Sequence, residues 1–421
     1  MPSPAGPRPN LPRYAGFAAV IAAAGIPLYI HLPAYLATRY GIRLETLGSL
    51  LLALRLLDFA QDPALGWILS RLGRLRELAV GAAALLLGAG MVGLFAVPAP
   101  VTPLVWVVAC LILTFTGFSM LSIQLYSDGV ARGATAGHVR VATWREAGAL
   151  IGITTACLLP FTLPGDGFRG FAVVFALGLA AAAWGMRGRW IAAPRSKTPL
   201  GKLFRDPVAR RFLLLAFLNA TPVAVTSTLF VFFVEARLGL PEQTGLFLVL
   251  FFVSAAASTA GWRYLAGRFG AQRALGAGMS LAIASFIWAY TLQTGDGLAF
   301  ALISVASGAA LGADMLLLPA LFSAHQARSG GDQALAFGFW TFVGKATLAL
   351  AAGLVLPTLA WAGFDPSGPR DPAAVDALAF LYAVVPCALK AGALALLFLA
   401  FDDEDVGQPS DRREDDALEG I

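Results

Sequence analysis

The sequence predicts an all-α integral membrane protein with about twelve transmembrane helices arranged in two six-helix pseudo-repeats. Hydrophobic residues make up 58% of the 421 residues and charged residues only 13%, whereas soluble proteins carry about 25% charged residues. The mean hydropathy is +0.74. Apolar runs of roughly 20 residues, the length that a helix needs to cross a bilayer, recur along the whole chain. A spanning helix satisfies its own backbone hydrogen bonds, and the alternating pattern of an outer-membrane barrel is absent.

Twelve spans are expected, and short connections such as PAPVTP join most of them. The Pro-rich start, MPSPAGPRPNLPRYAG, shows no small-residue cleavage site, so we expect an uncleaved first helix. The expected spans cover residues 14–38, 45–70, 77–97, 104–127, 140–163, 170–187, 212–236, 243–266, 273–294, 297–320, 334–360 and 376–401.

The two halves of the chain repeat one motif at the end of their second span. Arg, Gly and Arg recur at the same spacing in both, as Arg71, Gly73 and Arg76 and as Arg268, Gly270 and Arg273. We therefore predict a six-helix bundle over 1–190, a basic cytoplasmic linker over 191–211, a second bundle over 212–401 and an acidic cytoplasmic tail over 402–421. Two parallel repeats are typical of transporters that bind substrate between their halves.

Lysine and arginine are concentrated in alternate connections, including the linker. This bias predicts cytoplasmic amino and carboxyl termini in an inner or plasma membrane. The basic residues lie in loops and the tail is acidic, so nucleic acid is not an expected partner; the bilayer and a small molecule are. We expect a monomer.

Two aspartates stand within the second span, where an ionised group is costly. Asp58 and Asp62 are four residues apart and therefore share one helix face. Two carboxylates this close favour the capture of one proton or one hard cation, which makes H⁺ or Na⁺ the expected coupling ion. Arg55 lies on the same face, and an internal ion pair with it is the alternative interpretation.

Four further charges interrupt apolar runs. Lys345 in span eleven needs a carboxylate partner or an anionic substrate, and Asp314 in span ten is the candidate partner. A fixed ion pair that only joins these spans is the alternative. Arg145 in span five is a candidate substrate contact, with snorkelling to the interface as the alternative. For Lys390 in span twelve, a structural role is the favoured interpretation.

Enzyme chemistry is not expected. No metal cluster, catalytic triad, P-loop or dinucleotide fingerprint appears in the sequence, and no cofactor is expected. Cys110, Cys157 and Cys387 all lie in apolar runs without metal-ligand spacing and are interpreted as packing residues. Without a nucleotide site, transport would draw its energy from an ion gradient.

The stretch DFAQDPALGW resembles the D-x-x-x-D-P-x-x-G-W signature of the glycoside–pentoside–hexuronide:cation symporter (melibiose permease-like) family of the major facilitator superfamily. The stretches LPAYLATRYGI, WRE and AGWRYLAGRFGAQRAL and the lysine of span eleven are also similar to that family. The resemblance implies the major facilitator fold and cation-coupled sugar transport. It implies that Asp58 and Asp62 bind the cation, that Arg145 contacts sugar, and that Lys345 links the two sites.

Two stretches depart from the family pattern. Span one, AAVIAAAGIPLY, holds no charge, and MLSIQLYSD places Ser122 and Gln124 where the family has an aspartate and a proline. Ser122 and Gln124 are therefore the candidate substrate contacts of span four. The predicted function is a symporter that moves a sugar, glycoside or other small organic solute by alternating access. An amphiphile or lysolipid transporter of the same fold and a non-transporting assembly factor for a membrane complex are the alternatives.

Overall fold

The structure is a computed structural model that describes residues 10–25, 28, 32–40, 61–163, 167–191, 203, 205–330, 332–364 and 371–401. Within these residues, every regular element is a helix. Nine of the described helices are long and apolar enough to cross a bilayer, and α1 (Leu11–Ala23) is a shorter apolar helix. The predicted class, an all-α integral membrane protein, is confirmed.

The chain divides into two compact units, which we describe separately. The first unit comprises Met1–Leu200 and Gly331–Lys345, and the second comprises Gly201–Gly330 and Ala346–Ile421. Residues 334–345 of the predicted span eleven are part of the first unit. The predicted boundaries of the bundles, linker and tail stay predictions.

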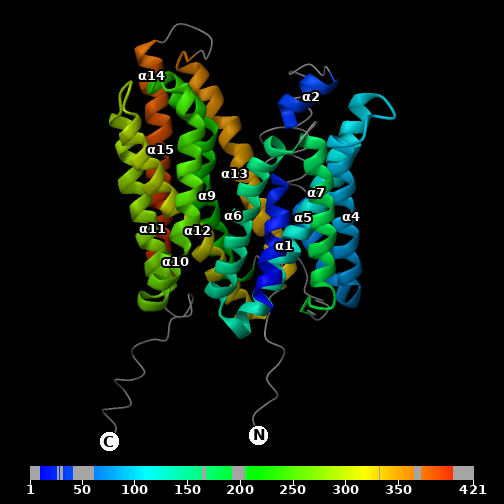
Figure 1. The fold of residues 1–421 in the computed structure, drawn as a ribbon. Helices are drawn as coiled ribbons and strands as arrows, with labels where there is room; N and C mark the ends of the chain where they lie inside the picture. The colour runs from blue at the N-terminus through cyan, green and yellow to red at the C-terminus, as the bar shows by residue number, and fades with distance from the viewer. Residues whose placement is uncertain are drawn as a thin grey trace, which may run out of the picture. The chain divides into compact units, whose positions relative to one another are not determined.

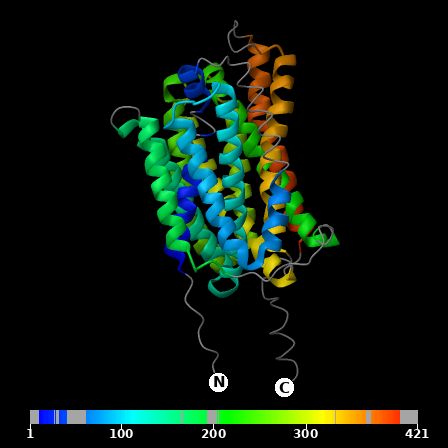
Figure 2. The ribbon, with the colours of Figure 1, turned by 90° about the vertical axis from the view of Figure 1, so that its right-hand side faces the viewer.

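The first unit is a bundle of long helices that run alongside one another (Figure 2). Helix α1 packs against α6 and α7, and α4 packs against α5 and α7. The core between them contains fully buried Phe17 and Leu87 together with Phe171. Besides α1, this unit contains a helical segment over residues 61–72, the 3-10 turn η2 (Gly73–Leu75), and α2 (Leu32–Tyr40), α4 (Arg76–Phe95), α5 (Pro103–Ala136), α6 (His138–Thr162) and α7 (Gly167–Met186).

Local sequence signals set the helix boundaries of this unit. The side chain of Asn10 accepts a hydrogen bond from the backbone nitrogen of Arg13 and so caps α1. Gly137 ends α5 and precedes α6 with φ of 88°, a conformation that favours glycine. This single glycine therefore lets two long helices follow each other directly.

In the second unit, α12 packs against both α10 and α11, while α15 packs against α9 and α11 (Figure 1). An aromatic cluster lies in its core, where the rings of Phe233 and Tyr382 stack at 4.1 Å between centroids. The helices are α9 (Pro207–Phe232), α10 (Thr244–Phe269), α11 (Ala271–Phe286), α12 (Gly297–Ser329), α14 (Pro372–Ala379) and α15 (Val385–Leu399), with the short elements η3 (Phe233–Arg237), η4 (Pro241–Gln243), η5 (Ile287–Thr291) and η6 (Phe380–Val384). Helix α13 (Gln333–Trp361) contributes its residues from 346 onward.

The predicted spans agree with the described helices, with two informative differences. Helices α5 and α12 have 34 and 33 residues and continue well past the predicted ends at 127 and 320. Their extensions contain buried polar residues, among them Asp128, Arg132 and Gln326. A prediction based on hydrophobicity stops at such residues, although their burial within the bundle lets the helix continue. Most of the predicted span two lies outside the described residues.

Candidate functional site

A buried ion pair joins three helices of the first unit. Asp62 lies at the start of the helical segment 61–72 and is fully buried. The Nζ atom of Lys345 on α13 lies 3.0 Å from its Oδ1 atom and donates a hydrogen bond of 2.6 Å to Oγ of Ser119 on α5. The lysine side chain keeps 18% exposure. One carboxylate and one hydroxyl thus hold an ammonium group that is not fully buried.

A close approach of two backbones accounts for this geometry. A Cβ atom added at Gly66 would lie 2.7 Å from the carbonyl oxygen of Ala334, and one added at Gly338 would lie 2.8 Å from the carbonyl oxygen of Asp62. Small residues at a helix–helix interface allow such close packing in membranes. We call this the glycine contact. Asp62 lies one turn before Gly66, and Lys345 lies two turns after Gly338, so the contact fixes the helices that carry the ion pair.

Arg145 on α6 is also buried in the first unit. Its Nε atom donates a hydrogen bond of 2.8 Å to Oε1 of Glu146, and its guanidinium lies over the ring of Tyr126 on α5 at 4.1 Å. Tyr126 in turn stacks on Phe337 of α13, with 5.3 Å between ring centroids. Arg145 is only 3% exposed, so the snorkelling alternative does not describe its side chain. Among the described residues, its Nη2 atom has no hydrogen-bond partner.

The two candidate contacts of span four differ in burial. Gln124 is fully buried on α5, and neither atom of its amide has a hydrogen-bond partner in the described part of the chain. Ser122 is half-buried on the same helix. A buried amide without partners is costly and is normally satisfied by water or by a ligand. This property supports Gln124 as a candidate substrate contact.

Asp314 does not pair with Lys345 as we predicted. In the second unit, Asp314 on α12 forms an ion pair with Lys390 on α15, whose Nζ atom also donates a hydrogen bond of 2.6 Å to Oδ1 of Asn219 on α9. Asp314 is in a buried ion pair, but its partner is Lys390 and not the predicted Lys345. Lys345 instead meets Asp62, because the glycine contact brings their helices together. Arg55 and Asp58, also predicted for the site, lie outside the described residues.

The two arginine-glycine motifs share a glycine with positive φ but differ in the burial of their second arginine. Gly73 and Gly270 both adopt positive φ, 52° and 88°. Arg76 is buried and donates a hydrogen bond of 2.7 Å to Oγ of Ser127, whereas its counterpart Arg273 is exposed. The first arginines of both motifs are exposed and lie against aromatic rings, Arg71 against Trp67 at 4.3 Å and Arg268 against Phe269 at 5.5 Å.

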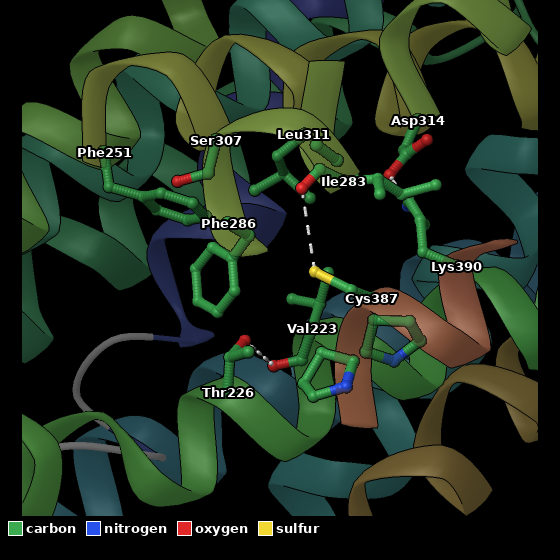
Figure 3. Close-up of a pocket in the computed structure, with 13 residues that line it drawn as sticks. Val223, Thr226, Phe251, Ile283, Phe286, Ser307, Leu311, Asp314, Cys387 and Lys390 are labelled. Carbon is green, nitrogen blue, oxygen red and sulfur yellow. Dashed lines mark hydrogen bonds and ion pairs between the residues drawn. The ribbon is translucent and has the colours of Figure 1, made fainter. Parts of the chain in front are cut away.

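The Asp314–Lys390 ion pair lies in the wall of a cavity in the second unit (Figure 3). The cavity volume is about 60 Å³. Its lining is mostly apolar, and Phe251 and Phe286 contribute aromatic rings. The sequence identified Asp314 and Lys390 because they are charged, whereas Asn219, Ser119 and Tyr126 were missed because uncharged polar residues are common in transmembrane helices. Among the described residues, no cluster of three or more His, Cys, Asp or Glu could hold a metal ion.

This fold is that of major facilitator transporters. A bacterial homologue of the iron transporter ferroportin, solved in an outward-facing state, superposes with a TM-score of 0.72 at 14% identity, covering 93% of this chain and 99% of that one. The E. coli fucose:proton symporter gives a TM-score of 0.70 at 13% identity over 93% of this chain and 98% of its own. At these identities the likeness concerns the fold alone.

The family follows from the sequence. The model of the MFS/sugar transport protein family matches residues 13–402, and the chain belongs to this family. The sodium-dependent lysophosphatidylcholine symporter 1 of Gallus gallus is 28% identical over 184 residues, which are 42% of this chain. The matched stretch spans 35% of that relative's length. The predicted family resemblance is therefore confirmed.

Proposed function

We propose that this protein is a cation-coupled secondary active transporter, a symporter that moves a sugar, glycoside or other small organic solute by alternating access. The observation that carries this proposal is the buried pair of Asp62 and Lys345, with Ser119 on the ammonium group. An ionised pair inside a membrane bundle is costly to maintain for packing alone. Its position on the family signature supports a role in transport.

The pair couples cation to substrate through competition for one carboxylate. While Lys345 neutralises Asp62, the pair carries no net charge. A proton or sodium ion that binds Asp62 weakens the ion pair with Lys345. One carboxylate carries a single negative charge, so it cannot neutralise both the bound cation and the ammonium group. The ammonium of Lys345 then loses its anionic partner, and an incoming hydroxyl or carboxylate of the substrate can take the place of that anion. Each ligand therefore improves the site for the other, as coupled transport requires.

The coupling cation is H⁺ or Na⁺, bound at Asp62 and at Asp58, four residues earlier in the sequence. Both family resemblance and carboxylate chemistry support this assignment. The Gallus gallus relative is named sodium-dependent and the E. coli structural neighbour is named a proton symporter, so known proteins of this fold use either ion. No further cofactor is proposed.

The substrate contacts are Arg145, Lys345, Gln124 and Ser122. The Nη2 atom of Arg145 and the amide of Gln124 are buried without partners among the described residues, and both are suited to hydroxyl groups. The ring of Tyr126 holds the guanidinium plane of Arg145 in position. Arg145 is therefore suited to bind the substrate through hydrogen bonds in fixed directions, and not only through its positive charge.

The proposed membrane arrangement follows the charge bias of the loops. Both termini and the linker 191–211 would lie in the cytoplasm of an inner or plasma-membrane protein, with bundles over 1–190 and 212–401, a tail over 402–421 and a monomeric state. The motifs at Arg71 and Arg268 would hold the cytoplasmic gate closed. Arg71→Ala should then increase labelling of cysteines placed on the cytoplasmic side, and unchanged labelling would contradict the gate.

Proteoliposomes with imposed Na⁺ or H⁺ gradients test the symport. We expect uptake of a sugar or glycoside to need one of these gradients in the wild-type protein. Asp62→Asn should retain exchange of substrate but lose accumulation against a gradient. Accumulation that ignores both ions and survives Asp62→Asn would overturn the proposed coupling.

An amphiphile or lysolipid substrate is the second candidate. It is supported by the printed name of the Gallus gallus relative, a lysophosphatidylcholine symporter, and by the mostly apolar lining of the cavity in the second unit. Uptake of lysophosphatidylcholine in the same proteoliposomes, without uptake of any sugar tested, would favour this candidate.

A further inference from the structure

We propose that the cavity of the second unit is a binding site for an uncharged, hydroxyl-bearing organic molecule with a short hydrocarbon group. The hydrocarbon group would occupy the apolar part of the cavity, and the hydroxyl group would bind at the Asp314–Lys390 pair. This inference rests on the proposed function only in treating the chain as a transporter of small organic molecules. The site itself is separate from Asp62 and Lys345.

Five helices contribute to the apolar part of the cavity, and the fifth is α15, through Pro386. Val223 and Pro222 come from α9, Phe251 from α10, Ile283 and Phe286 from α11, and Leu311 from α12. Figure 3 shows the ring of Phe286 facing the cavity, with Phe251 at the far end from Asp314. Water requires several polar partners in a cavity, and walls like these offer few of them. The volume of about 60 Å³ leaves room for a short hydrocarbon group, and the apolar walls favour that group over water.

The polar end of the cavity can both donate and accept a hydrogen bond. Lys390 has three N–H donors, and two of its partners are Asp314 and Asn219. The Oδ1 atom of Asp314 is buried and has no hydrogen-bond partner within the described ranges. Both residues are at least nine-tenths buried, with 4% exposure for Lys390 and 8% for Asp314. Asp314 and Lys390 both line this end of the cavity, so an acceptor group and a donor group lie side by side there.

The neutrality of the ion pair decides which polar group fits. A ligand cation or anion would bring an uncompensated charge to a pair that is already balanced and buried, which is strongly unfavourable. A hydroxyl group brings no net charge, and it can donate to the carboxylate of Asp314 while accepting from Lys390. Alkyl and aryl alcohols and glycosides have this combination of an uncharged hydroxyl and an apolar body.

Binding of hexyl β-D-glucoside to the full-length protein in lipid nanodiscs tests this assignment. We expect saturable binding by calorimetry beyond that of empty nanodiscs, and binding weaker by about tenfold or more for methyl β-D-glucoside, hexanoate and hexylammonium. Equal binding of the charged hexyl compounds, or of the methyl glucoside, would overturn the proposal.

Two neighbouring substitutions on α12 locate the binding site. Ser307 lines the cavity, so Ser307→Trp should fill it and weaken hexyl glucoside binding by about tenfold or more. Val305 is 41% exposed, and Val305→Trp should leave binding unchanged. Unchanged binding in folded Ser307→Trp would place the ligand elsewhere and overturn the proposal.

Cysteine labelling tests the same site without depending on the folding of that variant. Cys387 lines the cavity and is the remaining thiol when Cys110 and Cys157 are replaced by alanine. We expect N-ethylmaleimide to label it slowly, and hexyl glucoside but not methyl glucoside to protect it. No labelling, or no protection, would contradict the proposal.

Asp62→Asn separates this proposal from the proposed function. The variant should lose gradient-driven accumulation and keep both hexyl glucoside binding and protection of Cys387. If accumulation is ion-independent but the cavity binds, only the symport mechanism fails. If symport holds but the cavity does not bind, only the present inference fails.

Discussion

Each unit of this protein buries one lysine–aspartate pair, and the two pairs differ in their surroundings. In the first unit, Asp62 is fully buried while the side chain of Lys345 remains 18% exposed. In the second unit, the side chains of Lys390 and Asp314 are 4% and 8% exposed. The first pair also has a hydroxyl group as a neighbour, and the second has an amide.

The difference indicates which pair can exchange partners. A lysine that retains access to its surroundings can leave its carboxylate at a moderate cost, since its charge remains partly solvated. A lysine buried on all sides cannot, because removing its anion leaves an uncompensated charge. The same two residue types therefore suit coupling in the first unit and a permanent polar anchor in the second.

The largest expected effect comes from removing each carboxylate in turn. Asp314→Asn leaves the ammonium of Lys390 buried without its anion and should destabilise the protein by about 3–5 kcal/mol. Asp62→Asn should lower the unfolding temperature less, because Lys345 is partly exposed, yet it should abolish gradient-driven accumulation. The unfolding temperature and the gradient-driven uptake are measured for both variants and compared with those of the wild-type protein. Equal destabilisation by the two substitutions would remove the proposed distinction.

The second largest effect on stability is expected from filling the space at the glycine contact. Gly66→Ala places a methyl group 2.7 Å from the carbonyl oxygen of Ala334, and such overpacking costs about 1–3 kcal/mol. The substitution should also reduce uptake, since it displaces the helix that carries Asp62. Gly344→Ala on α13 is the matched control, because its added Cβ atom would meet nothing within 4 Å. Equal effects of both alanines on the unfolding temperature would show that helix propensity, not the contact, is responsible.

A smaller effect is expected at Arg145. Arg145→Lys keeps the positive charge but loses the planar group that lies over Tyr126, so we expect substrate affinity to fall by roughly tenfold with little loss of stability. Binding or concentration-dependent uptake measures the change. The control is Arg140→Lys, since Arg140 is exposed on the same helix. Unchanged affinity in Arg145→Lys would remove this residue from the proposed substrate contacts.

The smallest effect concerns Asp206, outside the membrane spans of the second unit. Its carboxylate caps α9 and pairs with His325 at 2.8 Å. Partial burial by itself raises the pKa of Asp206, but hydrogen bonds from His325 and from two backbone amides outweigh it, so the pKa is lowered. A lowered pKa means that the stabilisation is present above the ordinary value of 3.8 and is lost as the pH falls through the folded pKa.

Asp206→Ala should therefore lower the free energy of unfolding by about 1 kcal/mol at pH 7. The difference from the wild-type protein should shrink as the pH is lowered below 3.8. Thermal unfolding of both proteins across this pH range provides the measurement. Asp206→Asn, which keeps an oxygen atom for the cap, should be less damaging. If the difference in unfolding temperature between the two proteins grew as the pH was lowered, the lowered pKa of Asp206 would be contradicted.

The sequence predicted the helices well and the pairing of charges poorly. Apolar runs locate spanning helices because each run must match the bilayer thickness. Charged residues inside such runs are conspicuous, which is why Asp62, Lys345 and Arg145 were identified. Which carboxylate meets which lysine depends on helix packing instead, and Lys345 meets a residue 283 positions away. That information is not present in local composition.

The glycines of the contact illustrate what was missed. Gly66 was recognised only as a letter of a family signature, and Gly338 was not singled out. Their role becomes visible only when two helices distant in sequence are placed side by side. The same holds for Tyr126 and Asn219, whose roles depend on the charged groups beside them.

The glycine contact also limits how the proposed cation site at Asp62 could be engineered. The helices that carry Asp62 and Lys345 meet through their main chains at Gly66 and Gly338, and main chains cannot be trimmed by substitution as bulky side chains can. A redesign for a larger ion would have to change the set of donor atoms, for example at Ser119, and leave the dimensions of the site as they are. The cation selectivity of the proposed site is thus easier to change through the atoms that bind the ion than through the size of the site.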